Sequence, residues 1–180
     1  MNPQHVHWLG HASFRIEDGA TQIYIDPWKL PANTPKADVI FITHAHYDHF
    51  SPEDIAKIKK ESTAFFAPKD VGYQLDGNVI SVVPGQSFNL GSLRVKTVHA
   101  YNLGKQFHPK QNNWVGYLIT LSTGQKIYHS GDTDFTFRPP AMRRHLYHEW
   151  ERSRRSGKRV QTADAHSHAL GRYRRNEDGC

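Results

Sequence analysis

The stretch HAHYDH, residues 44–49, places three imidazoles and one carboxylate within six consecutive positions. It directly follows Val39–Ile42, a short apolar run that is typical of a strand buried on both faces. Imidazole and carboxylate groups are ligands that zinc accepts, and a loop at the end of a strand can turn several of them towards one point. The alternative is a histidine-rich surface loop, because the chain contains 13 histidines. So dense a set of ligand side chains favours a metal site.

The spacing within this loop indicates how ions would be shared. The i, i+2 spacing of His44 and His46 lets both side chains converge in an extended turn. Asp48 and His49 can then point to a neighbouring position as the chain enters the next helix. The loop alone therefore predicts one ion held by His44 and His46 and a second held by Asp48 and His49.

Residues 1–135 read as a succession of short strands with one helix. Apolar runs between turn signals predict strands at His5–Leu9, Ser13–Glu17, Gln22–Ile25, Val39–Ile42, Ala64–Ala67, Val79–Val83, Leu93–Val98, Val115–Leu121 and Lys126–Tyr128. The helix begins after Ser51, a suitable N-cap, with Pro52 at its first position and Ile55 and Ile58 on its apolar side. This order of elements predicts a sheet-rich α/β layered domain.

Two further candidate ligands lie at predicted strand ends. Alternation along the strand that begins at Leu93 would place His99 on the apolar face, where a satisfied core histidine is the alternative to a metal ligand. Asp132 follows Gly131, which allows a tight turn, so its two carboxylate oxygens could bridge two ions. An ordinary Asx turn is the alternative for Asp132.

HAHYDH after a strand, a distant His99, and SGDT at residues 130–133 together resemble the metallo-β-lactamase superfamily. WLGHASF at residues 8–14 and IDP at residues 25–27 resemble one branch of it, which contains ascorbate-phosphate lactonase-like metal-dependent hydrolases. The resemblance extends over residues 1–135. It implies an αββα sandwich with the metal ions at one edge of the two sheets.

The resemblance also implies a role for each candidate residue. The implied ligands of the first ion are His44, His46 and His99, those of the second are Asp48 and His49, and Asp132 bridges the two. The ions would be Zn²⁺, one or two per chain, or Mn²⁺. A metal-bound hydroxide would attack a carbonyl or phosphorus centre, and Asp48 would orient that nucleophile or accept its proton. His11 would donate a proton or contact the substrate, with a structural turn histidine as the alternative.

The composition changes after residue 135. Residues 1–135 contain 10 Lys, 2 Arg and 12 acidic side chains, whose charges cancel, whereas residues 136–180 contain 1 Lys, 10 Arg and 5 acidic side chains and carry the whole formal charge of +6. The apolar helix and strands of a second half-sandwich do not follow Asp132. We therefore predict a domain at 1–135 whose sandwich is incomplete in its second half. Residues 136–180 are predicted to be an Arg-rich tail, either disordered or out of frame.

These features predict a metal-dependent hydrolase acting on a small lactone, ester or phosphoester. One alternative is a non-catalytic metal-binding remnant with an incomplete second metal site. Another is a nuclease-like nucleic-acid-binding member, which the basic tail favours and the neutral body disfavours. The expected partner is a small anionic molecule, with no membrane involved, and apolar surface left by a missing layer would promote homo-oligomers. A single cysteine, Cys180, and the lack of a long apolar stretch predict a cytoplasmic protein.

Overall fold

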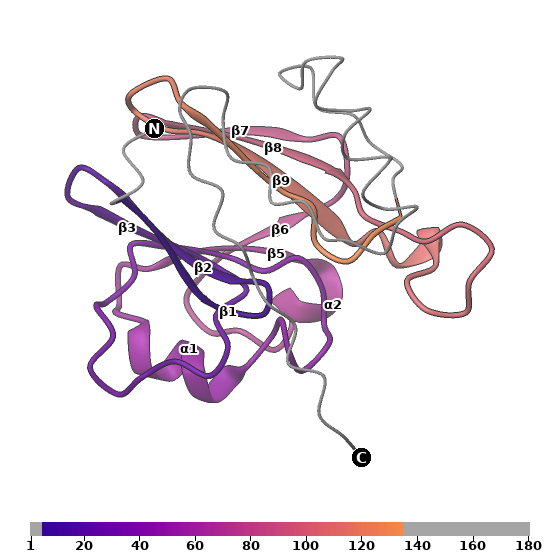
Figure 1. Ribbon diagram of the computed structural model, residues 1–180, viewed down its shortest axis with the longest axis horizontal. Helices are drawn as coiled ribbons and strands as arrows, with labels where there is room; N and C mark the ends of the chain where they lie inside the picture. Colours follow the sequence, from indigo (N-terminus) through magenta and orange to yellow (C-terminus); the bar gives the residue numbers. More distant parts are fainter. Residues whose placement is uncertain (1–4, 135–180) are drawn as a thin grey trace, which may run out of the picture. The chain divides into compact units, whose positions relative to one another are not determined.

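The computed structural model describes residues 5–134, and these residues form two β-sheets and two short α-helices (Figure 1). The first sheet contains β1 (Val6–Gly10), β2 (Ser13–Asp18), β3 (Thr21–Ile25), β4 (Val39–Phe41), β5 (Ala64–Pro68) and β6 (Asn78–Val82), in that order. The second contains β7 (Ser87–Leu90), β8 (Leu93–His99), β9 (Val115–Thr120) and β10 (Lys126–His129), in the order β10-β9-β8-β7. Every predicted strand is present, with its ends within one residue of the prediction.

The first sheet changes from antiparallel to parallel pairing at β3. The strands β1, β2 and β3 are joined as hairpins, whereas β3 to β6 pair in parallel. Parallel neighbours need a crossover connection, and α1 (Pro52–Ile58) joins β4 to β5 while α2 (Lys69–Gly72) joins β5 to β6. As predicted, Ser51 caps α1 by accepting a hydrogen bond from Asp54 N at 3.2 Å. The sequence does not predict α2, because a single turn is too short to show helical periodicity.

Two apolar cores lie on opposite faces of the first sheet. The core between the two sheets includes Ile16, Ile23, Phe41, Phe66, Val95, Tyr117 and Ile119. The core between the first sheet and the helices includes Tyr24, Ile40, Phe65, Ile55, Ile58 and Val71. Strand β4 supplies residues to both cores, which explains its continuous apolar sequence. The predicted α/β sandwich is thus confirmed as a helix layer and two sheet layers; within residues 5–134 no α-helix covers the outer face of the second sheet (Figure 1).

The sequence does not predict β7, because the turn-forming residues Asn89 and Gly91 interrupt its apolar pattern. The structure extends β7 to Leu90, which pairs with Leu93 across a tight hairpin. Phe88 and Leu90 are partly buried and pack against the core between the sheets. The side chains of this four-residue strand therefore alternate as a strand requires, but too briefly for the pattern to outweigh the turn residues beside it.

The end of β4 meets the end of β10 at one edge of the two sheets. Val115 N donates a hydrogen bond to the Thr43 carbonyl oxygen at 3.2 Å, which joins the sheets there. Gly131 lies against Thr43 with a φ of +60°, and a Cβ atom at Gly131 would lie only 3.1 Å from Thr43 Cβ. Both the close approach and the left-handed backbone favour glycine at this position. The segment that contains Asp132 is thereby brought beside the HAHYDH loop.

No helix within residues 5–134 is long and apolar enough to cross a lipid bilayer. The predicted Arg-rich tail at 136–180 lies outside the described residues. Its character, the domain boundary after residue 135 and the cytoplasmic location stay predictions.

Candidate metal centre

Asp26, directly after β3, organises the loop that carries the clustered ligands. Its side chain is fully buried, and its backbone has a φ of +46°, a region that aspartate enters more readily than most residues. One carboxylate oxygen accepts a hydrogen bond from Thr43 N at 2.8 Å. The other accepts from Thr43 Oγ1 at 2.7 Å and from His49 Nδ1 at 2.8 Å. Asp26 therefore ties the start of the loop to its end, a role that the IDP motif alone does not reveal.

The same hydrogen bonds determine which ring nitrogen of His44 and of His49 faces the site. Thr43 Oγ1 donates to Asp26, so it accepts from His44 Nδ1, 2.9 Å away. His49 likewise donates its Nδ1–H to Asp26. Both rings then present Nε2 to the site, as metal-binding histidines do when a carboxylate or hydroxyl holds the other nitrogen. His49 Nε2 is buried and has no hydrogen-bond partner among residues 5–134.

Three overlapping groups of side chains bring their ligand atoms within 4.8 Å of one another. The groups are His44, His46 and His108; His11, Asp48 and His49; and His44, His49 and Asp132. Imidazole nitrogens with a few carboxylate oxygens are the donor set of zinc and similar divalent ions. A buried polar atom without a partner calls for an explanation, and a metal ligand explains His49 Nε2. The residues present therefore fit a centre of one or two ions.

The side chains of this cluster differ in the charge that they favour at neutral pH. Burial, and then the charge of His49, lowers the pKa of His44 to about 2. Burial lowers the pKa of His49 as well, but the neighbouring carboxylates of Asp132 and Asp26 outweigh it and raise that pKa to about 10. The neighbouring imidazole of His49 holds the pKa of Asp132 well below its usual range. At neutral pH His44 is therefore uncharged, while positive charge is favoured between Asp26 and Asp132, where a divalent ion could replace the proton of His49.

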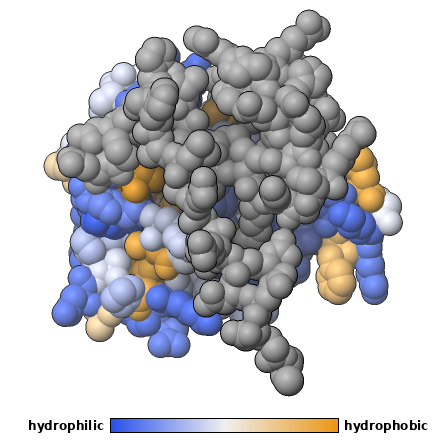
Figure 2. Space-filling view, in the orientation of Figure 1, coloured by the Kyte–Doolittle hydropathy of each residue, from blue (hydrophilic) through white to orange (hydrophobic). Residues whose placement is uncertain are grey.

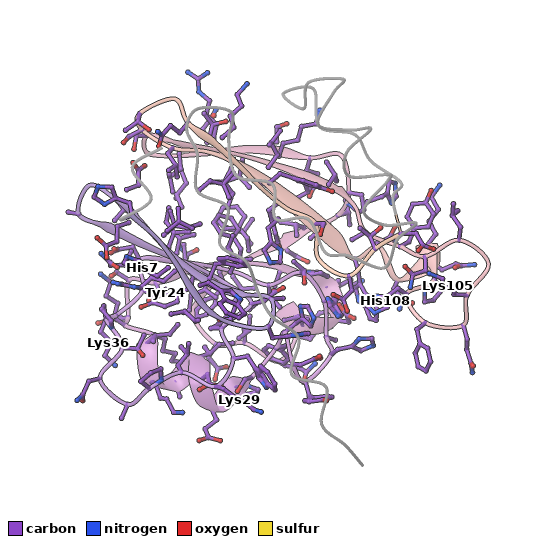
Figure 3. The ribbon with its side chains drawn as sticks, viewed as in Figure 1. His7, Tyr24, Lys29, Lys36, Lys105 and His108 are labelled. Carbon is purple, nitrogen blue, oxygen red and sulfur yellow. The ribbon has the colours of Figure 1, made fainter. Side chains whose placement is uncertain are left out.

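The loop between β8 and β9, residues 100–114, supplies one candidate ligand to this site. Much of the loop faces solvent: Leu103 is 63% exposed and Phe107 is 70% exposed. Figure 2 shows hydrophobic and hydrophilic side chains side by side on this part of the surface, at the right edge of the view. His108 is different, because it is only 7% exposed and has a φ of +60°. Figure 3 shows His108 towards the sheets and Lys105 further out on the same loop.

Trp114 forms a wall behind three of the histidines. Its ring centroid lies 5.0 Å from that of His44, 4.9 Å from that of His46 and 5.1 Å from that of His108. Trp114 Nε1 donates to Asp70 Oδ2 at 2.8 Å, which fixes the plane of the indole. The packing restricts the rotation of the three imidazoles.

The structure does not bring His99 to any of these groups, which corrects the expectation that it is a ligand. Its side chain is exposed at the end of β8, and its ring centroid lies 5.8 Å from that of Tyr101. The alternation that buries Thr97 shifts at Val98, which is also buried. Strand β8 therefore ends with His99 facing outwards, and His108 is the third histidine beside His44 and His46. No local pattern marks His108, because its polar, lysine-containing surroundings indicate a solvated loop.

His11 does reach the site. It has a φ of +48°, and its Nε2 lies 3.1 Å from Asp48 Oδ2. Its ring centroid lies 5.1 Å from that of His49. Trp8 Nε1 donates to the His11 carbonyl oxygen at 2.9 Å, which helps to hold the turn in this conformation. His11 is thus placed either to act as a ligand with Asp48 and His49 or to exchange a proton with Asp48.

Asp132 lies between the histidine groups. Its Oδ1 is 3.4 Å from His49 Nε2, and its Oδ2 is 3.6 Å from His108 Nε2. Both distances are longer than a good hydrogen bond. The carboxylate therefore faces both groups without closing on either, which is the position that a bridging ligand would take.

Two facing sheets, a helix layer, and histidines and aspartates gathered where β4 and β10 end define the class of metallo-β-lactamase-fold metalloproteins. A family model described as Beta-lactamase superfamily domain matches residues 5–144, and the chain belongs to this family.

Relatives and solved structures agree with this assignment. The UPF0173 metal-dependent hydrolase of Thermoplasma volcanium is 32% identical over 139 residues, which cover 71% of this chain and 60% of that protein. A UPF0173 metal-dependent hydrolase of Thermococcus onnurineus is 34% identical over 154 residues, 79% of this chain and 66% of that protein. A crystal structure from Parabacteroides distasonis, assigned as a metal-dependent hydrolase, has a TM-score of 0.65 at 29% identity, with 71% and 60% of the two chains covered. The chain spans about 60% of the length of the curated relatives it matches.

Proposed function

We propose that this chain binds one or two Zn²⁺ ions, or Mn²⁺ in their place, and hydrolyses a small lactone, ester or phosphoester. The observation that carries the proposal is His49 Nε2, which is buried, has no hydrogen-bond partner among the described residues and faces Asp132 at 3.4 Å. The relatives named as metal-dependent hydrolases support the same reaction class.

The described side chains divide into binding and proton-handling groups. His44, His46 and His108 would hold one ion and His49 and Asp48 the other, with Asp132 facing both. The chemistry that a divalent ion supplies when bound is a lowered pKa of water and stabilisation of the negative charge that develops on a carbonyl or phosphoryl oxygen. Asp48 would orient the attacking water and accept its proton. His11 Nε2, 3.1 Å from Asp48 Oδ2, would pass that proton to the leaving group.

The charges around the site favour a small anionic substrate. Lys29 Nζ lies 4.2 Å from the centroid of the Trp28 ring, and Trp28 in turn contacts His11 at 5.5 Å between ring centroids. A cation held beside the site would attract an anion. The charges of residues 1–135 cancel, which argues against nucleic acid, because a nucleic-acid-binding surface needs a net basic patch.

Metal content and turnover test the proposal together. We expect at least one Zn²⁺ or Mn²⁺ per purified chain by elemental analysis, and hydrolysis of a generic phosphodiester or lactone. His44→Ala should lower the metal content and abolish hydrolysis, while the exposed His99→Ala should change neither. Purified protein without metal, or a His44→Ala variant with unchanged metal content, would contradict the proposal.

A second candidate is a metal-binding remnant that does not catalyse. It is favoured by the composition change after residue 135. The remnant would take up metal with the same dependence on His44 but would turn over none of these substrates.

A further inference from the structure

The loop that carries His108 is closed on itself by Asn102. Asn102 N donates to the His108 carbonyl oxygen at 2.8 Å, and Asn102 Nδ2 donates to the Phe107 carbonyl oxygen at 3.2 Å. These bonds hold residues 102–108 together as one unit. They do not fix that unit relative to the other ligands, and the exposed Leu103 and Phe107 contribute little burial that could do so.

Thr133 joins the base of this loop to the segment that contains Asp132. Tyr101 N donates to Thr133 Oγ1 at 3.0 Å, and the same hydroxyl lies 2.8 Å from the Tyr101 carbonyl oxygen. Asp134 N also donates to that carbonyl oxygen, at 3.2 Å. The backbone on both sides of Tyr101 is therefore bonded to the two residues that follow Asp132.

Asp134 reaches further along the loop. Its Oδ2 accepts from Leu103 N at 3.0 Å, and its Oδ1 accepts from Lys105 Nζ at 2.6 Å. The Asp134 side chain is 13% exposed whereas that of Lys105 is 56% exposed. A half-exposed ion pair contributes little, but a carboxylate that accepts from a backbone N–H in a sheltered position makes a strong bond. The contact with Leu103 N is therefore the more important of the two.

We propose that Asp134 is a positioning residue that couples the His108 loop to Asp132, so that both side chains face one ion. The inference rests on the proposed metal centre and deepens it. Asp132 and Asp134 are two positions apart, so any displacement of this short segment moves Asp132 and the anchor of the His108 loop together. Without Asp134, Asn102 would still close the loop and Trp114 would still pack against His108, but the loop would lose the bond that fixes Leu103 relative to the segment of Asp132.

The test compares three variants of the full chain by Co²⁺ absorption and by Zn²⁺ competition with a chelator. Asp134→Ala removes both contacts, whereas Asp134→Asn keeps an oxygen for Leu103 N. Asp18→Ala is the matched control, because Asp18 is also a buried carboxylate, accepts from Ser122 N at 2.8 Å, and lies at the end of β2 away from the metal centre.

Asp134→Ala should lower Zn²⁺ affinity about tenfold, the low end for residues that orient metal ligands, and should alter the Co²⁺ spectrum because His108 is lost. Asp134→Asn should keep most of the wild-type Zn²⁺ affinity and Co²⁺ spectrum. Asp18→Ala should lower the stability of the chain but change neither the affinity nor the spectrum. An unchanged spectrum in folded Asp134→Ala, or an equal change in Asp18→Ala, overturns the inference.

Two further outcomes are decisive. Should Asp134→Ala fail to fold, Thr133→Val, which removes the bonds to Tyr101 at nearly constant volume, must show the spectral change, and an unchanged spectrum there overturns the inference. A wild-type chain that binds no Co²⁺ overturns the proposed metal centre and this inference with it. If the wild-type chain and Asp134→Ala both bind Co²⁺ with the same spectrum, the proposed metal centre stands and only this inference is overturned.

Discussion

The two segments that supply most of the candidate ligands are built in opposite ways. The loop at residues 44–49 holds four ligand side chains in six positions and rests on one buried carboxylate, Asp26. The loop at residues 100–114 supplies only His108 and depends on bonds to Thr133 and Asp134. The first set of ligands follows from local chain geometry. The second exists only after the tertiary fold has brought separate segments together.

The strongest test of this comparison uses alanine variants of two histidines, His99 at the end of β8 and His108 in the loop that follows. His108→Ala should lower Zn²⁺ affinity by about 100-fold or more, because loss of a ligand should cost at least as much as loss of a residue that orients one. His99→Ala should leave the affinity unchanged, since His99 is exposed at the end of β8. Chelator competition measures both affinities. If His99→Ala loses as much Zn²⁺ affinity as His108→Ala does, His99 is a metal ligand after all.

The fold could be predicted from the sequence where patterns are local and long enough. The alternation in β8 and the continuous apolar run of β4 specify their strands and which faces are buried. The four residues of β7 and the single turn of α2 are too short to compete with the turn residues around them. Their pairing is decided by packing against the rest of the sheet.

The candidate site also combines residues that local sequence patterns reveal with residues that they do not. The motif at residues 44–49 reveals its own ligands, and Gly131 marks the turn that presents Asp132. The sequence points to His99 instead of His108, because strand alternation is assumed to persist to the last residue of β8, whereas Val98 and Thr97 are both buried. A histidine in a solvated loop has no periodicity to mark it, so only contacts distant in sequence identify it.

A variant at Asp26, which holds the first loop, should lower Zn²⁺ affinity more than a variant at Thr133 or Asp134, which hold the second. Asp26→Ala leaves Thr43 and His49 without their acceptor, so Zn²⁺ affinity should fall about 10–100-fold. The metal-free chain should also lose about 3 kcal/mol of stability in urea unfolding, because a buried partner is removed. Asp26→Asn tolerates the φ of +46° and still accepts from Thr43 N, so its losses should be smaller.

The control for Asp26 is Asp76→Ala, a change of an exposed carboxylate. Its stability should stay within about 0.5 kcal/mol of the wild type. If Asp26→Ala lowers Zn²⁺ affinity no more than Asp76→Ala does, the first loop does not depend on its buried carboxylate, and the contrast between the two loops fails.

The smallest effect is expected at Lys105, and it separates charge from backbone anchoring in the second loop. Lys105→Met removes the 2.6 Å ion pair with Asp134 but leaves the bond from Leu103 N to the same carboxylate. Lys105 is 56% exposed, so the stability of the chain should fall by about 1 kcal/mol or less, and the difference should shrink at high salt. Zn²⁺ affinity should stay within about twofold of the wild type, since exposed ion pairs contribute little to holding a loop. A loss in Lys105→Met as large as that in Asp134→Ala would mean that the ion pair, rather than the hydrogen bond to the Leu103 backbone, holds His108 in place.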